Sequence, residues 1–143
     1  FKIFFYLALV LLFSGCVNDA KPPLKPNQKA FEKEDRYILF ALRAEEIHDH
    51  DLASKLFDKL YEKSAKKEYL YRSLQNSIAS KRYEKVIKTI DKITNGKIDD
   101  FTLIRLKIIT LSQMQQFQEA KTLALKLVAS SKDENDYILL SDI

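Results

Sequence analysis

The residue types best suited to covalent or metal chemistry stand at only two places in this chain. Its one cysteine, Cys16, ends an apolar run, and its two histidines lie within His48-Asp49-His50-Asp51. A single thiol leaves no partner for a disulfide within the chain and no thiolate cluster for a metal ion. Cys16 is therefore a candidate for chemistry that needs one thiol alone.

The His48-Asp49-His50-Asp51 stretch is the one local group of side chains able to bind a metal ion. A zinc site needs three or four fixed ligands, and the chain has no third histidine. Aspartates in such a turn also cap the free N–H groups of a following helix. We therefore predict a solvated turn, with adventitious metal binding as the alternative, and no metal ligands or other cofactor.

The rest of the sequence contains no recognisable catalytic arrangement. Only Gly15 and Gly96 are present, too few for a glycine-rich phosphate loop or a dinucleotide fingerprint, and no Gly-x-Ser-x-Gly sequence frames a serine. Carboxylate pairs such as Glu45-Glu46 fall on predicted helix surfaces, where they serve solvation and pairing along the helix. We assign no catalytic residues and predict that this chain is not itself an enzyme.

The segment before Cys16 has the form of an export signal. Every residue from Ile3 to Phe13 is apolar or aromatic, and Lys2 precedes this run. The run is too short to cross a bilayer as a helix, which takes about 20 residues, but it fits the apolar region of a signal peptide. The chain opens on Phe1 rather than Met, so the true start is expected to be missing.

The sequence Phe13-Ser14-Gly15-Cys16 resembles the lipobox of bacterial lipoproteins, in which an apolar and two small residues precede the cysteine. The resemblance implies cleavage before Cys16, a diacylglyceryl group on its thiol, and an acyl chain such as palmitate on its new amino group. Phe13 departs from the commoner Leu or Val. An ordinary secretory signal with a chance cysteine, or a buried core helix, are the alternatives. Residues 1–15 are thus expected to be removed, with membrane lipid as the partner of Cys16.

The resemblance also implies a place in the bacterial cell envelope, with the folded part facing the periplasm. In some bacteria, Asp directly after the acylated cysteine retains a lipoprotein in the inner membrane. Here Val17 and Asn18 follow, which favours the outer membrane over the inner one.

Residues 16–33 are predicted to form the lipidated cysteine and a tether. All three prolines of the chain lie here, in a polar setting, and such segments stay solvated and partly extended. As a flexible coil the tether would reach about 20–25 Å. We expect it to hold the folded part away from the lipid head groups.

The charge of the chain is too weak to favour a nucleic-acid partner. The formal net charge of +4 becomes +3 when residues 1–15, which include Lys2, are removed. Binding of nucleic acid requires Lys and Arg clustered on one face. The tyrosines near basic residues are expected to pack between helices rather than stack on bases; they are Tyr37, Tyr69, Tyr71 and Tyr83.

From residue 34 onwards the chain lacks proline and its apolar residues follow helical spacing. Helices are expected around 37–47, 52–61, 69–79, 83–93, 103–114 and 117–128, and 135–143 begins a seventh. Gly96 is expected to cap the C-terminus of the fourth helix. Asp99 or Asp100 is expected to cap the start of the fifth.

The first turn of each second helix recurs at a fixed interval. Ala53, Val86 and Ala120 are separated by 33 and 34 residues. This pattern resembles the tetratricopeptide repeat, a helix-turn-helix unit of 34 residues. The resemblance implies an all-α helical-hairpin solenoid over residues 34–143, with units at 34–66, 67–100 and 101–134 and the start of a fourth at 135–143.

Two features of these repeats depart from the family or point beyond the chain. Leu74 and Ile108 replace the small residue that the family has in its first helix, and no unit closes with proline. A repeat stack needs a polar outer face on its terminal helix, whereas Tyr137-Ile138-Leu139-Leu140 is apolar. We therefore expect the protein to continue beyond Ile143.

The resemblance further implies a concave face, lined by the first helix of each unit, that binds a peptide. Tyr71 and Arg105 are the expected anchors, since tyrosine and arginine are frequent at interfaces; the alternative is that several of these positions belong to the core. The full set of candidate groove residues is Ile38, Leu42, Glu45, Tyr71, Gln75, Ile78, Arg105, Ile109 and Ser112.

The expected function is that of a membrane-anchored scaffold that binds a protein or peptide partner. The alternative is the helical arm of a larger cell-wall-acting enzyme whose catalytic domain lies beyond residue 143. The complete reading frame distinguishes the two: a chain that ends after one or two further repeats would exclude the enzyme, and a catalytic domain downstream would exclude the scaffold.

Overall fold

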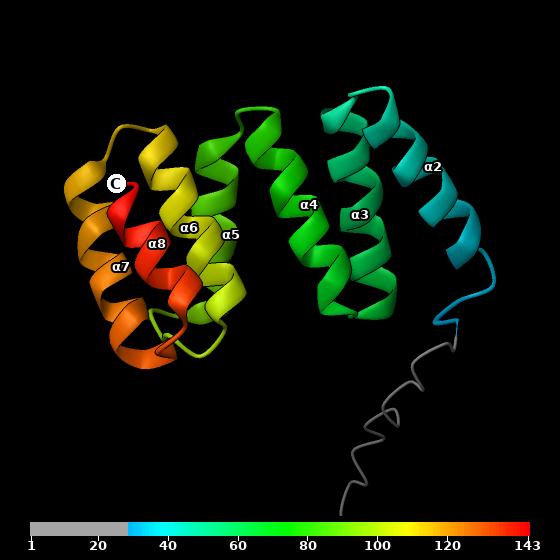
Figure 1. Ribbon diagram of the computed structural model, residues 1–143. Coiled ribbons are helices and arrows are strands. Elements are labelled where there is room, and N and C mark those ends of the chain that lie inside the picture. The colour runs from blue at the N-terminus through cyan, green and yellow to red at the C-terminus, as the bar shows by residue number, and fades with distance from the viewer. Residues whose placement is uncertain (1–28) are drawn as a thin grey trace, which may run out of the picture.

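The computed structural model describes residues 29–143, and every regular element in that range is an α-helix (Figure 1). The all-α prediction is confirmed for these residues. The helices are α2 (Glu34–Glu46), α3 (His50–Ser64), α4 (Lys67–Ala79), α5 (Tyr83–Thr94), α6 (Phe101–Gln113), α7 (Phe117–Ser131) and α8 (Glu134–Ser141). The signal peptide, Cys16 and most of the predicted tether lie outside the described residues.

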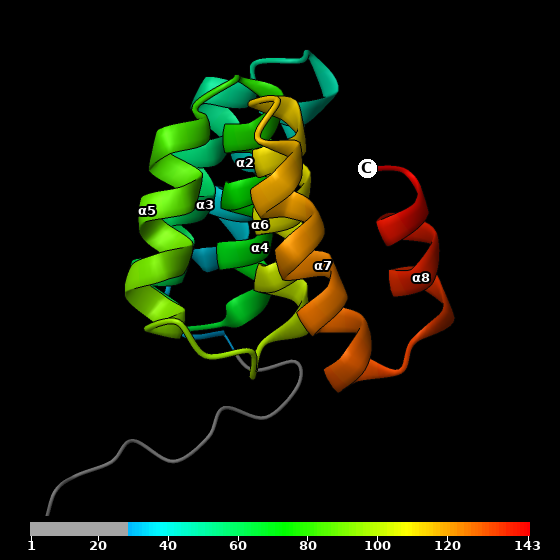
Figure 2. The ribbon, with the colours of Figure 1, turned by 90° about the vertical axis from the view of Figure 1, so that its left-hand side faces the viewer.

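Each helix packs against the next one in the chain, and α4 also contacts α6. The helices follow one another from α2 at one end of the molecule to α7 and α8 at the other (Figure 1). The view turned by 90° shows α8 as a short helix beside α7 (Figure 2). Helices that are close in sequence are therefore also close in space along the whole described chain.

The three turns within the helix pairs α2/α3, α4/α5 and α6/α7 share one hydrogen-bonded geometry. In each turn a backbone N–H donates to the carbonyl five residues earlier. The three bonds are Asp49 to Ala44 at 2.8 Å, Arg82 to Ser77 at 2.8 Å and Gln116 to Leu111 at 2.9 Å. Each donor is the second residue after the C-cap of the first helix. The residue before each donor is left-handed, at φ 59° for His48, 61° for Lys81 and 62° for Gln115. These bonds form a Schellman motif, which recurs at the interval of the sequence pattern although the turn residues differ.

Lys81→Gly is expected to raise the free energy of unfolding by about 0.5 kcal/mol. A side chain at positive φ costs roughly 1–2 kcal/mol, and glycine returns about 0.5–1 kcal/mol of that as unfolded-state entropy. Lys121→Gly, in the exposed interior of α7, is the control and should lower stability by about 1 kcal/mol. Urea denaturation measures both, and an equal loss in the two variants would contradict the assigned turn.

The helix ends agree with the sequence at one cap and differ at another. Asp100 is the N-cap of α6, where its Oδ1 accepts the Leu103 N–H at 3.3 Å. At the end of α5 the cap is Asn95, at φ 48°, and Gly96 follows at φ 76°. The cap therefore lies one residue earlier than predicted, because asparagine tolerates the left-handed conformation almost as readily as glycine.

The core consists of apolar clusters between successive helices. Ala53, Val86 and Ala120, the recurring small positions, are fully buried, which allows the helix axes to approach closely. Leu74 and Ile108, the two departures from the family, are also buried. The larger side chains of Leu74 in α4 and Ile108 in α6 are therefore accommodated in the core.

The last residues of the predicted tether belong to the folded part. Phe31 packs on the cluster that contains Ala41 and Phe57, and its ring meets that of Tyr37 edge-on at 6.0 Å. The Glu34 N–H donates to the Phe31 carbonyl at 3.1 Å. The folded part therefore begins before residue 34, a few residues earlier than the sequence predicted.

Candidate interaction surface

Two sets of matching positions are exposed on the three first helices: Glu46, Ala79 and Gln113 near their C-terminal ends, and Leu42, Gln75 and Ile109 one turn earlier. Leu42 of α2 and Ile109 of α6 are 44% and 37% exposed, and Gln75 of α4 is exposed as well. The three positions are separated by the repeat interval of the sequence. They form a stripe of two aliphatic side chains and one amide that a partner can reach, and we call it the exposed stripe.

Three other predicted groove residues lie partly under the surface. Ile38 packs on the cluster that includes Phe57, and Ile78 packs on the cluster that includes Leu74. The Oγ of Ser112 is buried and is the one such side-chain atom without a hydrogen-bond partner among residues 29–143. These three residues therefore pack in or beside the core and offer little surface to a partner.

Tyr71 and Arg105, the predicted anchors, are engaged within the chain. The Tyr71 hydroxyl donates to Asp100 Oδ2 at 2.9 Å. The guanidinium of Arg105 donates from Nε to Asp136 at 2.6 Å and from a terminal nitrogen to Asp133 at 3.1 Å. Both side chains therefore bridge to the start of the next first helix, and a partner that used their polar groups would have to displace these carboxylates.

Glu45, in the last turn of α2, joins this helix to the middle and C-terminal half of α4. Its Oε1 accepts from Asn76 Nδ2 at 2.6 Å, and its Oε2 pairs with Arg72. Like Tyr71 and Arg105, this predicted groove residue connects neighbouring first helices. These three residues were predicted to line a groove, and in the structure their polar groups are engaged within the chain.

A series of carboxylates, two of them buried and Asp100 partly buried, links the starts of α2, α4, α6 and α8, and we call it the carboxylate ladder (Glu34, Asp100 and Asp136). Glu34 at the start of α2 accepts from Lys66 Nζ and from the Tyr69 hydroxyl, each at 2.7 Å. Both donors belong to the start of α4 or the residue before it. Asp100 then joins α4 to α6 and Asp136 joins α6 to α8, so each neighbouring pair shares at least one rung.

This ladder was not predicted from the sequence, although the sequence contains a signal for it. An acidic residue occurs at or near the start of α2, α6 and α8. About one repeat interval away in the sequence, on either side, stands a Tyr, Lys or Arg that can donate to it. In α4 the pattern is inverted, because Lys66, Lys67 and Tyr69 supply donors instead of an acceptor. Aligning the units on their helix starts would have shown this alternation of acceptors and donors.

The ladder shifts the pKa of its carboxyl groups downward. Burial alone would raise the pKa of Glu34 and of Asp100, but hydrogen bonds outweigh it, from Lys66 and Tyr69 in the first case and from Lys67 and Tyr71 in the second. The hydrogen bond from Arg105 lowers the pKa of Asp136. Burial and the bond to Asp100 raise the pKa of the Tyr71 hydroxyl.

These shifts predict a stability maximum between about pH 5 and pH 10. Carboxyls with a lowered pKa in the folded state stabilise it above their unfolded values of 4.5 and 3.8 for Glu and Asp, and this contribution is lost as the pH falls through the folded values. Tyrosines with a raised pKa stabilise the fold below their unfolded value of 10.0, and that contribution is lost at higher pH. Urea midpoints measured from pH 3 to 11 test this, and a flat profile below pH 5 would contradict it.

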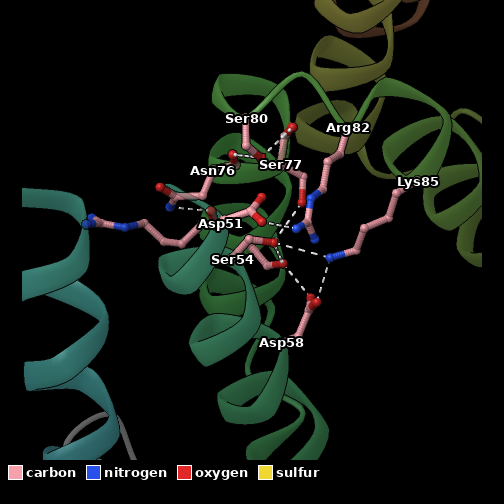
Figure 3. Close-up of polar contacts among 10 residues, drawn as sticks. Asp51, Ser54, Asp58, Asn76, Ser77, Ser80, Arg82 and Lys85 are labelled. Atoms are coloured by element: carbon pink, nitrogen blue, oxygen red, sulfur yellow. Dashed lines mark hydrogen bonds and ion pairs between the residues drawn. The ribbon is translucent and has the colours of Figure 1, made fainter. Parts of the chain in front are cut away.

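A second polar network joins α3, α4 and α5 (Figure 3). Ser54 is fully buried and its Oγ lies 2.7 Å from Ser77 Oγ. Lys85 Nζ donates to Ser54 Oγ at 3.2 Å and to Asp58 Oδ2 at 2.6 Å. A serine beside a lysine is a possible nucleophile and base, but this serine is closed to substrates and the ammonium is paired with a carboxylate. The network holds three helices together.

Only His48 and Asp49 of the predicted His48–Asp51 turn lie between α2 and α3, because α3 begins at His50. The helix therefore starts two residues earlier than the sequence predicted. Asp49 caps α3 by accepting the Leu52 N–H at 3.0 Å, and His50 Nδ1 lies 2.8 Å from Asn76 Oδ1. Asp51 pairs with Arg82. Within residues 29–143 no group of three or more His, Cys, Asp or Glu side chains is arranged to hold a metal ion.

An open cleft of about 520 Å³ between α3 and α5 was not predicted. Its apolar lining includes Tyr61, Leu70 and Ile93, and Lys88 and Lys92 border it on α5. Tyr61 comes from α3, Leu70 from α4 and Ile93 from α5, so this lining forms only when the three helices pack together. Periodicity within single helices gives no signal for such a gap.

Among the described helices none has the length and apolar character needed to cross a membrane. Comparison of the chain with protein-family models, curated proteins and solved structures finds no match. The functional conclusion therefore depends on the residues and geometry of this chain.

Proposed function

We propose that this chain is a membrane-anchored lipoprotein of the bacterial cell envelope whose tetratricopeptide-like repeats hold a protein or peptide partner. The observation that carries the proposal is the exposed stripe, in which Leu42, Gln75 and Ile109 occupy matching positions of α2, α4 and α6 and remain accessible. Residues that only stabilise a core are not kept at the surface in this way at each repeat interval.

The shared turn geometry and the carboxylate ladder support a solenoid of three helical hairpins, with α8 as the first helix of a fourth. Turns of one geometry connect the two helices of each pair, and a ladder rung joins the first helices of neighbouring pairs. A regular stack of this kind produces a continuous surface along its first helices. The exposed stripe would then run along that surface.

The chemistry of the stripe defines the partner as a peptide segment that alternates apolar and hydrogen-bonding groups. Leu42 and Ile109 offer aliphatic contact at its two ends, and the Gln75 amide can donate to and accept from a peptide backbone between them. The lipobox-like Phe13-Ser14-Gly15-Cys16 sequence places this surface on an anchored protein that faces the periplasm, with the outer membrane favoured over the inner one.

The test compares captured partners for two matched double variants of the intact lipoprotein. Leu42→Glu with Ile109→Glu should lose the specific partners, because each carboxylate replaces an apolar contact at the stripe. Phe117→Glu with Leu125→Glu alters two similarly exposed apolar residues of α7 and should retain them. Variants of Tyr71 or Arg105 are less suitable because they also break ladder rungs.

Circular dichroism should show the same helical content in both double variants. Partners that survive the stripe variant at wild-type yield would place the binding surface elsewhere. For the anchor, Cys16→Ser should abolish incorporation of labelled palmitate and leave the precursor uncleaved; undiminished labelling would overturn the lipoprotein assignment.

A further inference from the structure

The outward face of α2 exposes large apolar side chains, whereas the terminal helix of a repeat stack normally has a polar outer face. Leu39, Phe40 and Ile47 are 65%, 55% and 57% exposed, and Arg36 and Arg43 are exposed beside them. These five residues define the outer face of α2. Ala41 and Ala44, which are buried, lie on another side of the helix, and Ala41 packs in the cluster with Phe57 and Leu60 of α3.

The spacing of these residues forms a continuous stripe along the helix. Arg36, Phe40, Arg43 and Ile47 follow intervals of four, three and four residues, and Leu39 borders them. The first helix of a stack normally presents a polar surface to water. A face that alternates large apolar side chains with arginines instead has the composition of a helix that lies in a membrane interface.

The connection to Cys16 selects the lipid surface over other occupants. α2 is the first helix after the predicted tether, which would reach about 20–25 Å from an acylated cysteine. Arginines of such a face extend their guanidinium groups to the head groups while the aliphatic parts of their side chains stay in the apolar layer. Both arginines also complement anionic lipid, and Arg43 can exchange its surface pair with Glu46 for a phosphate.

A second copy of the chain fits the same face less well. α2 has 13 residues and is therefore about 20 Å long, so one of its faces provides much less than the roughly 800 Å² per partner of a stable interface. Two copies would also place their arginines on one another's surface. The apolar and basic residues thus favour a bilayer.

We infer that the outer face of α2 rests on the anionic surface of the membrane that holds the lipid anchor. This inference depends on the proposed lipidation of Cys16 and adds an orientation to it. With α2 against the bilayer, the helices that follow extend away from the membrane, and the exposed stripe is presented from the side of the molecule rather than covered by lipid.

The chain contains no tryptophan, so a single introduced indole reports on its surroundings without background. Phe40→Trp and, as the matched control, Phe117→Trp on the exposed surface of α7 (49% exposed for the natural Phe117) are each prepared as lipidated protein. They are reconstituted in vesicles of phosphatidylethanolamine and phosphatidylglycerol with brominated acyl chains. The Phe40→Trp emission should shift to the blue and lose at least half its intensity, and the Phe117→Trp emission should stay unquenched.

Adding Arg36→Ser and Arg43→Ser to Phe40→Trp should at least halve the quenching. Absence of quenching at position 40 overturns the inference, and so does equal quenching at both positions, which would mean non-specific adsorption. A blue shift without quenching also overturns it, because protein would then cover the face. Mass spectrometry of the Cys16 peptide separates the two proposals: an unmodified cysteine refutes the anchor, whereas a lipidated protein with an unquenched position 40 refutes only the orientation.

Discussion

Replacing Ile108 by alanine is expected to lower the free energy of unfolding by about 3 kcal/mol. Ile108 is fully buried in the cluster that includes Leu111, Ala124 and Leu127. Its neighbours lie on both α6 and α7, so the loss of its side chain would leave a cavity that neither helix can close alone. Urea denaturation followed by circular dichroism measures the effect.

The neighbouring Ile109 provides the matched control, since it has the same side chain in the next position of the same helix. It is 37% exposed, so Ile109→Ala should cost at most about 1 kcal/mol. Similar losses in the two variants would mean that α6 is rotated about its axis relative to the structure. That result would also remove Ile109 from the exposed stripe.

Asp100→Ala is expected to cost about 2 kcal/mol, because one carboxylate serves three donors. It caps α6 through the Leu103 N–H, and it accepts from the Tyr71 hydroxyl and from Lys67 Nζ at 2.7 Å. Loss of an N-cap costs about 1 kcal/mol, and leaving the partly buried Tyr71 hydroxyl without its acceptor costs a similar amount. The exposed lysine contributes little.

The adjacent Asp99 is exposed and is the control for a charge change at the same loop. Asp99→Ala should stay within about 0.5 kcal/mol of the wild type. Asp100→Asn should recover part of the loss, because the amide oxygen still caps the helix and accepts one hydrogen bond. Equal stability of the Asp99 and Asp100 variants would contradict the rung between α4 and α6.

The helices could be predicted from the sequence because each one follows from local spacing. Apolar residues three and four apart define a buried face without knowledge of the partner helix, and Asp100 stands directly before such a run. Asn95 shows the limit of this reasoning. Asparagine and glycine both accept a left-handed backbone, and the choice between adjacent residues depends on where the last turn of α5 stops packing.

The ladder and the roles of Tyr71 and Arg105 could not be obtained in this way. Their acceptors are separated from them by 29 to 31 residues, so the contact exists only after two units have stacked. The register of the repeats placed both side chains correctly on the first helices. The repeat register did not specify how far the side chains extend, and in the structure their polar groups reach Asp100 and Asp136 at the start of α6 and in α8.

The carboxylate ladder also determines how the protein would carry mechanical load. Tension between the proposed anchor at Cys16 and a proposed partner at Ile109 of α6 would pass through the Glu34 and Asp100 rungs in series, because these join α2 to α4 and α4 to α6. The first rung, at Glu34, bears the pull closest to the membrane and has Lys66, Tyr69 and the Ala30 N–H as its donors. Under force the helix pairs would therefore unfold one at a time, and the chain would lengthen in steps while the remaining pairs stay folded.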